Sequence, residues 1–189
     1  MRELSLNILD ISMNSVKAGA TEILIELIEN ETDLVFKIVD NGKGMTKEFQ
    51  KTVTDPFTTS RKTRKVGLGL PFLKLAAEQT GGSLTISSKT KDESTDGSHG
   101  TEVVASFKKT SIDFTPLGDI TSTIVTLVQG SPEIDFVYHH KVGETSIKLD
   151  TKELVEVLGD RSMLTAPEVL MWISESLNEQ YDSIGYIKY

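Results

Sequence analysis

The sequence predicts an α+β protein built as a two-layer α/β sandwich, in which a mixed β-sheet carries its helices on one face. Segments with helical apolar spacing alternate along the chain with short segments of β character, in the order helix, hairpin, helix, helix, hairpin. The pattern changes after Thr110. We therefore expect a first domain over residues 1–110 and a small C-terminal α+β module over residues 111–189.

The composition is ordinary for a globular chain, with an excess of negative charge. The 189 residues are 38% hydrophobic and 25% charged, and their formal net charge is −8. This charge argues against nucleic acid or an anionic membrane surface as the main partner. There is no cysteine, and no segment approaches the roughly 20 apolar residues that cross a bilayer. The N-terminus is polar too early for a secretory signal, so we expect a cytoplasmic protein.

A helix is expected over residues 3–18, because apolar residues recur there every three or four positions. Polar residues form a second stripe on the same helix, and this stripe has two interpretations. Most such stripes are solvated surface, but asparagine is a weak helix former, and two asparagines beside an acid and a base also fit a binding site. The stripe consists of Asn7, Asp10, Asn14 and Lys17.

A β-hairpin follows, with strands expected over residues 21–28 and 34–39. The second strand leads into a turn that begins with Asp40 and contains Gly42 and Gly44. These glycines can take positive φ and expose backbone N–H groups beside the carboxylate. Asp-Asn-Gly is also common turn punctuation, so the turn by itself fits both a simple connection and a binding loop.

Thr46 is expected to cap a short helix that runs to about Val53. Residues 54–66 then lack periodicity and carry four basic residues within five positions. A glycine-rich turn, Gly67-Leu68-Gly69-Leu70, and a helix over residues 71–78 come next. Such a turn favours anion binding, because backbone N–H groups and the helix dipole act at the same place. The four basic residues are Arg61, Lys62, Arg64 and Lys65.

Two strands and a polar connector complete the first domain, and the C-terminal module follows with three helices and a hairpin. His139 and His140 alternate on one strand of that hairpin, so they point to opposite faces and do not share a metal site. Two capping boxes, Asp150 with Glu153 and Thr165 with Glu168, open the last two helices. The expected elements are strands 83–88 and 100–107, helix 117–129, strands 134–138 and 145–149, and helices 151–158 and 166–180.

Taken together, residues 7–107 resemble the GHKL superfamily of ATP-binding domains, which includes gyrase, heat-shock chaperones, histidine kinases and MutL. The resemblance rests on five motifs in order, and it implies a Bergerat-type ATP-binding fold with ATP and Mg²⁺ as ligands. The motifs are the N-box helix Asn7–Lys17, the DxGxG turn at Asp40, the F-box region Asp55-Pro56-Phe57, the GLGL box Gly67–Leu70 and the pair Gly100-Thr101.

The resemblance implies roles for the matched positions. Asp40 would accept the exocyclic amine of adenine, and Thr101 would contact the adenine side. Asn14 would bind Mg²⁺, and Lys17 would contact phosphate. Gly42, Gly44 and Met45 would let the nucleotide approach the backbone. The phosphates would be held by Gly67, Leu68, Gly69 and Leu70, and one of Arg61, Lys62, Arg64 and Lys65 would neutralise charge on the γ-phosphate.

Asp10 departs from the family pattern, because hydrolysing members carry a water-activating glutamate at this position. It is therefore the candidate catalytic residue, with a shorter reach. No two-helix segment with a phosphoacceptor histidine precedes Asn7, so we do not expect a complete sensor histidine kinase. We expect a Mg²⁺-dependent ATP-binding protein that acts on a separate protein partner as a regulatory kinase or switch. The alternatives are a MutL-like slow ATPase that dimerises with ATP and a nucleotide sensor without catalysis.

Overall fold

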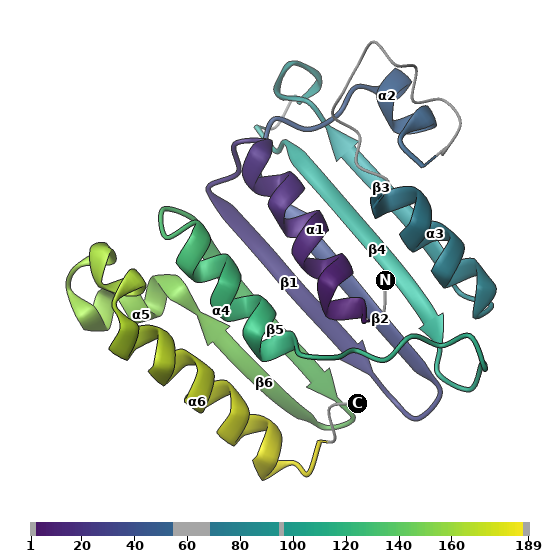
Figure 1. Cartoon of the computed structure of the whole chain (residues 1–189). Helices are drawn as coiled ribbons and strands as arrows, with labels where there is room; N and C mark the ends of the chain where they lie inside the picture. Colours follow the sequence, from purple (N-terminus) through teal and green to yellow (C-terminus); the bar gives the residue numbers. More distant parts are fainter. Residues whose placement is uncertain (1–2, 55–68, 95–96, 187–189) are drawn as a thin grey trace.

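Six strands form one mixed sheet, and the longer helices lie against one of its faces (Figure 1). The structure is a computed structural model that describes residues 3–54, 69–94 and 97–186. Its helices are α1 (Leu4–Lys17), α2 (Lys47–Thr52), α3 (Gly69–Gln79), α4 (Ile120–Gly130), α5 (Thr151–Leu158) and α6 (Pro167–Ser183), with 3₁₀ turns η1 (Lys91–Glu93) and η2 (Arg161–Thr165). Its strands are β1 (Glu22–Glu29), β2 (Asp33–Asp40), β3 (Ser83–Lys89), β4 (Gly100–Lys108), β5 (Asp135–Val142) and β6 (Thr145–Asp150).

The strand order across the sheet is β3-β4-β2-β1-β5-β6. Strands β1 and β5 are parallel, and every other neighbouring pair is antiparallel. The predicted α+β class, with a mixed sheet and helices on one face, is confirmed. The hairpin β5–β6 continues this sheet beyond β1, so residues 111–189 supply part of the same layer. The division of the chain at residue 110 stays a prediction.

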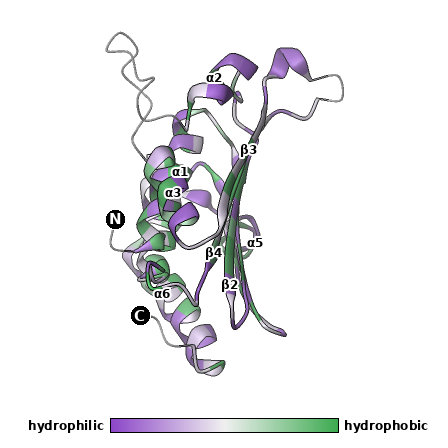
Figure 2. Ribbon diagram, turned by 90° about the vertical axis from the view of Figure 1, so that its right-hand side faces the viewer, coloured by the Kyte–Doolittle hydropathy of each residue, from purple (hydrophilic) through white to green (hydrophobic). Residues whose placement is uncertain are grey.

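The core lies between the sheet and the helices α1, α3 and α6, which Figure 2 shows on one side of the strands. Alternate residues of β1 and β2 point to this side, because strand side chains alternate with a period of two. The buried apolar side chains of β2 are Leu34, Phe36 and Ile38, and those of α1 include Leu4 and Ile8. Each of these side chains contributes about 1.5–3 kcal/mol by leaving water. This packing fixes the positions of α1 and β2, the two elements on which the candidate residues Asp10, Asn14 and Asp40 lie.

Most expected helix ends are confirmed. Gly19 takes the left-handed conformation after α1, with φ +76. The Thr46 side chain accepts from the N–H of Phe49, and Asp150 accepts from the N–H groups of Lys152 and Glu153. Among the described residues, the return bond from the Glu153 side chain that would complete the expected capping box is not formed. Helix α4 begins later than expected, at Ile120, because Asp119 is its N-cap.

The capping box expected at Thr165 is wrong. Thr165 belongs to the 3₁₀ turn η2, where its hydroxyl donates to the carbonyl of Ser162. Helix α6 has Ala166 at the N-cap position and begins at Pro167 without a side-chain cap. Proline at this position needs no donor partner and already has a helical φ, so the helix starts without the box.

The two adjacent histidines lie on opposite faces of β5, as expected. The His140 side chain is fully buried, whereas that of His139 is 32% exposed. Helix α6 is likewise divided into two faces, with Ile173, Leu177 and Tyr181 buried. Within the described ranges, no helix combines the length and the apolar character that a membrane crossing requires.

Candidate functional site

Asp40, the last residue of β2, is held by donors from three parts of the chain. Its Oδ1 accepts from the backbone N–H groups of Gly42, at 2.9 Å, and of Thr101, at 3.2 Å. Its Oδ2 accepts from the hydroxyl of Ser15 on α1, at 2.6 Å. The residue is 7% exposed. A carboxylate oxygen can accept two hydrogen bonds, so Oδ1 is saturated by described residues and Oδ2 retains one acceptor position.

The turn after Asp40 depends on its glycines for different reasons. Gly44 has φ +71, and a Cβ there would lie 2.1 Å from the carbonyl oxygen of Lys89. Positive φ was expected at Gly42 as well, but Gly42 is not among the positive-φ residues. A Cβ at Gly42 would instead lie 3.0 Å from both Ala18 Cβ and Asp40 Oδ1. Glycine is needed there because the turn packs closely on the end of α1.

Polar contacts also hold this turn against its neighbours. The Asn41 amide oxygen accepts from the N–H groups of Thr21, at 2.8 Å, and Glu22, at 3.1 Å. On the other side, His99 Nδ1 lies 2.7 Å from the carbonyl oxygen of Gly42. These contacts connect the turn to the start of β1 and to the segment before β4.

The structure adds two residues, Ser88 and Gln50, which have no distinctive signal in the sequence. The Ser88 hydroxyl accepts from the N–H of Met45 and lies 2.8 Å from Thr101 Oγ1. The Gln50 side chain bonds the carbonyl oxygens of Met45 and Ser88 and the N–H of Ser88. Two of the predicted site residues, Met45 and Thr101, are thereby joined through one serine.

Ser15 is a third addition, and the sequence does contain a signal for it. It occupies the same helical stripe as Leu4, Ile8 and Ile11, all of which are buried. A serine in an apolar stripe needs a hydrogen-bond partner when it is buried. Its partner is Asp40, and its sequence neighbour is Asn14, so Ser15 connects the turn with the polar stripe of α1.

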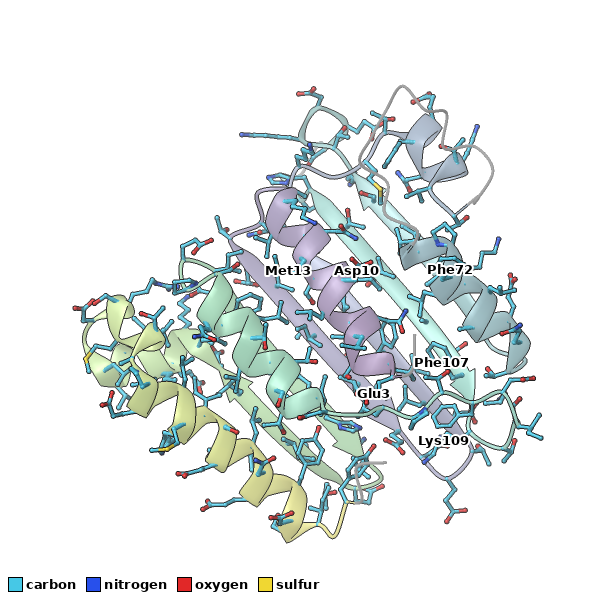
Figure 3. All side chains as sticks on the ribbon, viewed as in Figure 1. Glu3, Asp10, Met13, Phe72, Phe107 and Lys109 are labelled. Carbon is cyan, nitrogen blue, oxygen red and sulfur yellow. The ribbon has the colours of Figure 1, made fainter. Side chains whose placement is uncertain are left out.

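That polar stripe reaches the start of α3. A Cβ on Gly69 would lie 1.8 Å from Asp10 Oδ2, so the carboxylate of Asp10 occupies the space beside the first residue of α3 (Figure 3). Within the described residues, neither Asp10 nor Asn14 has a side-chain hydrogen bond or ion pair. Asn14 is partly buried and Lys17 is exposed in the last turn of α1.

Part of the predicted phosphate site, namely the basic segment and the first half of the GLGL box, lies outside the described residues. Arg61, Lys62, Arg64, Lys65, Gly67 and Leu68 fall there, as does the segment Asp55-Pro56-Phe57. Gly69 and Leu70 form the first turn of α3, where backbone N–H groups lack helical partners. The Leu70 side chain is buried in the core, so only its backbone can face a ligand.

A cavity of about 470 Å³ lies at the Asp40 end of the sheet, lined by Asp40, Ser88, His99 and Thr101 among others. The residues of the α1 stripe do not line it. The structure therefore brings the predicted residues together in two groups. One is the Asp40 group at the ends of β2 and β4, and the other is the α1–α3 group of Asp10, Asn14 and Gly69.

A family model described as histidine kinase-, DNA gyrase B- and HSP90-like ATPase matches residues 1–111. The sensor protein KdpD of Clostridium acetobutylicum is 33% identical over 89 residues, which are 44% of this chain and 10% of that protein. The chain thus spans about a tenth of that relative's length.

Two solved structures share the fold. The MutL ATPase domain of Aquifex aeolicus, complexed with ADP, has a TM-score of 0.52 and 15% identity, covering 85% of this chain and 70% of that chain. The N-terminal domain of a DNA repair protein has a TM-score of 0.53 and 16% identity, covering 86% and 59%. Both structures match a larger part of this chain than the family model, which ends at residue 111. The shared fold therefore continues into the C-terminal segment.

Proposed function

Because this chain belongs to the family of histidine kinase-, DNA gyrase B- and HSP90-like ATPases, we propose that it binds ATP at the Asp40 and α1–α3 groups. The observation that carries the proposal is the anchored carboxylate of Asp40. Three described donors hold it in place, and one acceptor position on Oδ2 remains. The exocyclic amine of adenine is a donor that suits this position. Guanine carries a carbonyl oxygen at the corresponding ring position and would be repelled.

The α1–α3 group suits the triphosphate end of the nucleotide. The N–H groups in the first turn of α3, which lack partners within the helix, favour an anion, as does the dipole of this helix. Asn14 is the proposed Mg²⁺ ligand, since an amide oxygen without a described partner fits a hard cation that retains several waters. When bound, the cation would neutralise phosphate charge. Asp10 would orient the attacking water or hydroxyl through its carboxylate.

We further propose that the chain acts as a regulatory protein kinase or an ATP-dependent switch on a separate protein, which residues 111–189 would recognise. The similarity to the sensor protein KdpD supports this reading. A second candidate is a slow conformational ATPase that dimerises when ATP binds. It is favoured by one observation, namely that the fold shared with the MutL ATPase domain extends over 85% of this chain.

Nucleotide binding is tested first by thermal unfolding and calorimetry with Mg²⁺-ATP and Mg²⁺-GTP. ATP at 100 times its Kd should add about 2.7 kcal/mol to the free energy of unfolding. Asp40→Asn should weaken ATP binding at least tenfold, because the amide offers a weaker acceptor in place of the carboxylate. Asp113→Asn, an exposed control, should bind as the wild type does. If saturating ATP left the unfolding of the wild type unchanged, the proposal would fail.

The chemistry is tested with ATP labelled in the γ-phosphate. Release of phosphate that Asp10→Asn abolishes would indicate an ATPase, and ATP-dependent doubling of the mass would favour the dimerising type. Label on a protein captured in ATP but not in ADP would indicate a kinase. If the chain bound ATP but neither released nor transferred the γ-phosphate, and if Asp10→Asn did not change binding, the result would favour a nucleotide sensor without catalysis.

A further inference from the structure

Helix α6 exposes two large apolar side chains on the face opposite its buried residues. Met171 is 58% exposed and its neighbour Trp172 is 51% exposed. The other face contributes Ile173 and Leu177 to the core and packs against α4 and β6. The helix therefore presents the pair on a supported surface. Exposed tryptophan is uncommon, and tryptophan is enriched among the residues that dominate binding at protein interfaces.

Carboxylates surround this pair along the helix. Glu168 lies one turn before Trp172, and Glu175 lies one turn after Met171, on the same helical face. Glu179 extends the face by a further turn, and the sequence of α6 contains no lysine or arginine. Within the part of the chain that the structure describes, none of the three glutamates forms an ion pair. Their negative potential is therefore available to a partner.

We propose that this α6 face, defined as Glu168, Met171, Trp172 and Glu175, binds a basic amphipathic segment of a protein partner. An apolar side chain of that segment would pack on Trp172, and its lysine or arginine side chains would lie opposite the two glutamates. Nucleic acid and anionic lipid are disfavoured because the carboxylates repel phosphate. This inference rests on the proposed function in one respect: the α6 face would be the surface that binds the separate protein partner.

The two kinds of contact make different contributions. Apolar contact with Trp172 would supply most of the affinity, because central aromatic anchors dominate interface energies. The glutamates would select a basic partner and speed its association, so their effect should weaken as salt screens them. A basic segment with one apolar face satisfies both requirements, whereas an acidic or purely polar segment satisfies at most one.

Trp172 is the single tryptophan of the chain, so its fluorescence reports directly on this face. The probe is a fluorescein-labelled helical peptide of leucine and lysine, with leucine on one face, and it is titrated against the full chain without nucleotide. We expect a saturable blue shift of the Trp172 emission together with a rise in peptide anisotropy. Leaving out nucleotide separates this test from that of ATP binding.

The matched variants are Glu168→Lys/Glu175→Lys and Glu133→Lys/Glu144→Lys, which change the net charge equally. All four side chains are exposed, so both variants should unfold at the wild-type temperature. The first should bind the peptide at least tenfold more weakly, and the second within about twofold of the wild type. Trp172→Ala should lose most of the binding seen by anisotropy.

Three results would overturn the proposal. The first is a peptide that binds without shifting the Trp172 emission. The second is equal binding of a peptide with glutamate in place of lysine. The third is a blue shift that follows protein concentration alone, accompanied by a doubled mass in sedimentation, because it would show a second copy covering the α6 face.

Discussion

Two buried carboxylates, Asp40 and Glu29, are stabilised by different means. Asp40 accepts from two backbone N–H groups and the Ser15 hydroxyl, all of them neutral. Burial alone would raise the pKa of Glu29, but the adjacent imidazole of His140, hydrogen bonds from Lys109 and Tyr186 and the charge of Lys109 lower it to about 2. Neutral donors leave Asp40 able to accept from a ligand, whereas the partners of Glu29 neutralise its charge within the fold.

Removing the Ser15 hydroxyl should weaken both the fold and the site. Ser15→Ala deletes a hydrogen bond to a charged acceptor, so the free energy of unfolding should fall by about 1–3 kcal/mol. The affinity for ATP should fall by about tenfold, because Asp40 loses the donor that positions Oδ2. Urea unfolding and calorimetry measure the two effects. Ser183→Ala, which removes a local bond at the end of α6, should leave ATP binding unchanged.

Glu29 should make the fold sensitive to acid. Its folded-state pKa of about 2 lies below the usual 4.5, so its stabilisation is present above pH 4.5 and is lost as the pH falls towards 2. After allowing for screening by solvent, the loss is about 2 kcal/mol. Glu29→Gln should be less stable at pH 7 and should lose less stability between pH 5 and 3.

Urea unfolding at several pH values measures this difference. Glu31→Gln, at an exposed position in the following turn, is the control and should keep the pH dependence of the wild type. Parallel pH curves for the wild type and Glu29→Gln would contradict the assigned role of Glu29.

At the scale of elements, the site depends on how closely β4 approaches the end of β2. Gly100 opens β4 with φ +129, and a Cβ there would lie 1.8 Å from the carbonyl oxygen of Asp40. Thr101 follows immediately and donates to the Asp40 side chain. The close approach of these two strands therefore brings the backbone donor to the carboxylate.

Gly100→Ala should destabilise the protein by more than 2 kcal/mol, from both strain and the clash with the β2 backbone. ATP binding should be lost at temperatures where the variant is still folded. Gly97→Ala provides the comparison, because Gly97 also has positive φ but has nothing within 4 Å of its Cβ position. That control should cost about 1 kcal/mol and preserve binding. Equal losses in the two variants would mean that close approach is unimportant.

At the scale of the whole molecule, a buried polar cluster crosses the join between the N-terminal and C-terminal parts of the sheet. Glu29 of β1 contacts His140 of β5, with Oε2 3.3 Å from Nε2. His140 Nδ1 lies 2.8 Å from the Tyr181 hydroxyl of α6, and Tyr138 contacts the same hydroxyl. Burial raises the pKa of both tyrosines. Through His140 the cluster links Glu29 of β1 to Tyr181 of α6, although His140 Nε2 completes no hydrogen bond with a described residue.

A chain that ends at Thr110 should therefore fail to form a stable monomer. It would expose the β1 edge that β5 covers, and it would leave Glu29 without His140 and Tyr186. We expect aggregation and a non-cooperative thermal transition. A full chain cut by a protease beside the fully exposed Ile112 should keep both parts associated and fold normally. A folded monomer of residues 1–110 would contradict this expectation.

Local patterns in the sequence predicted most of the elements and the positions of the motifs. The apolar spacing of α1, the alternation of β2 and the cap at Thr46 each depend on neighbours within a few residues, so they can be read from the sequence. Thr165 was misassigned because Pro167 starts α6 without a side-chain cap. Gly42 does not have the positive φ that the sequence suggested. A glycine is needed there because a Cβ would collide with Ala18 at the end of α1, which lies far from Gly42 in the sequence.

The sequence alone indicated the identity and order of the secondary-structure elements, and its resemblance to the GHKL superfamily predicted a nucleotide-binding role for Asp40. The tertiary structure decided the parallel pairing of β1 with β5, the contact of Glu29 with His140, and the hydrogen bond from Ser15 to Asp40. Each of these joins residues far apart in the chain. Local spacing does not encode such partners, because they are selected by which strand covers an open edge and which donor satisfies a buried charge.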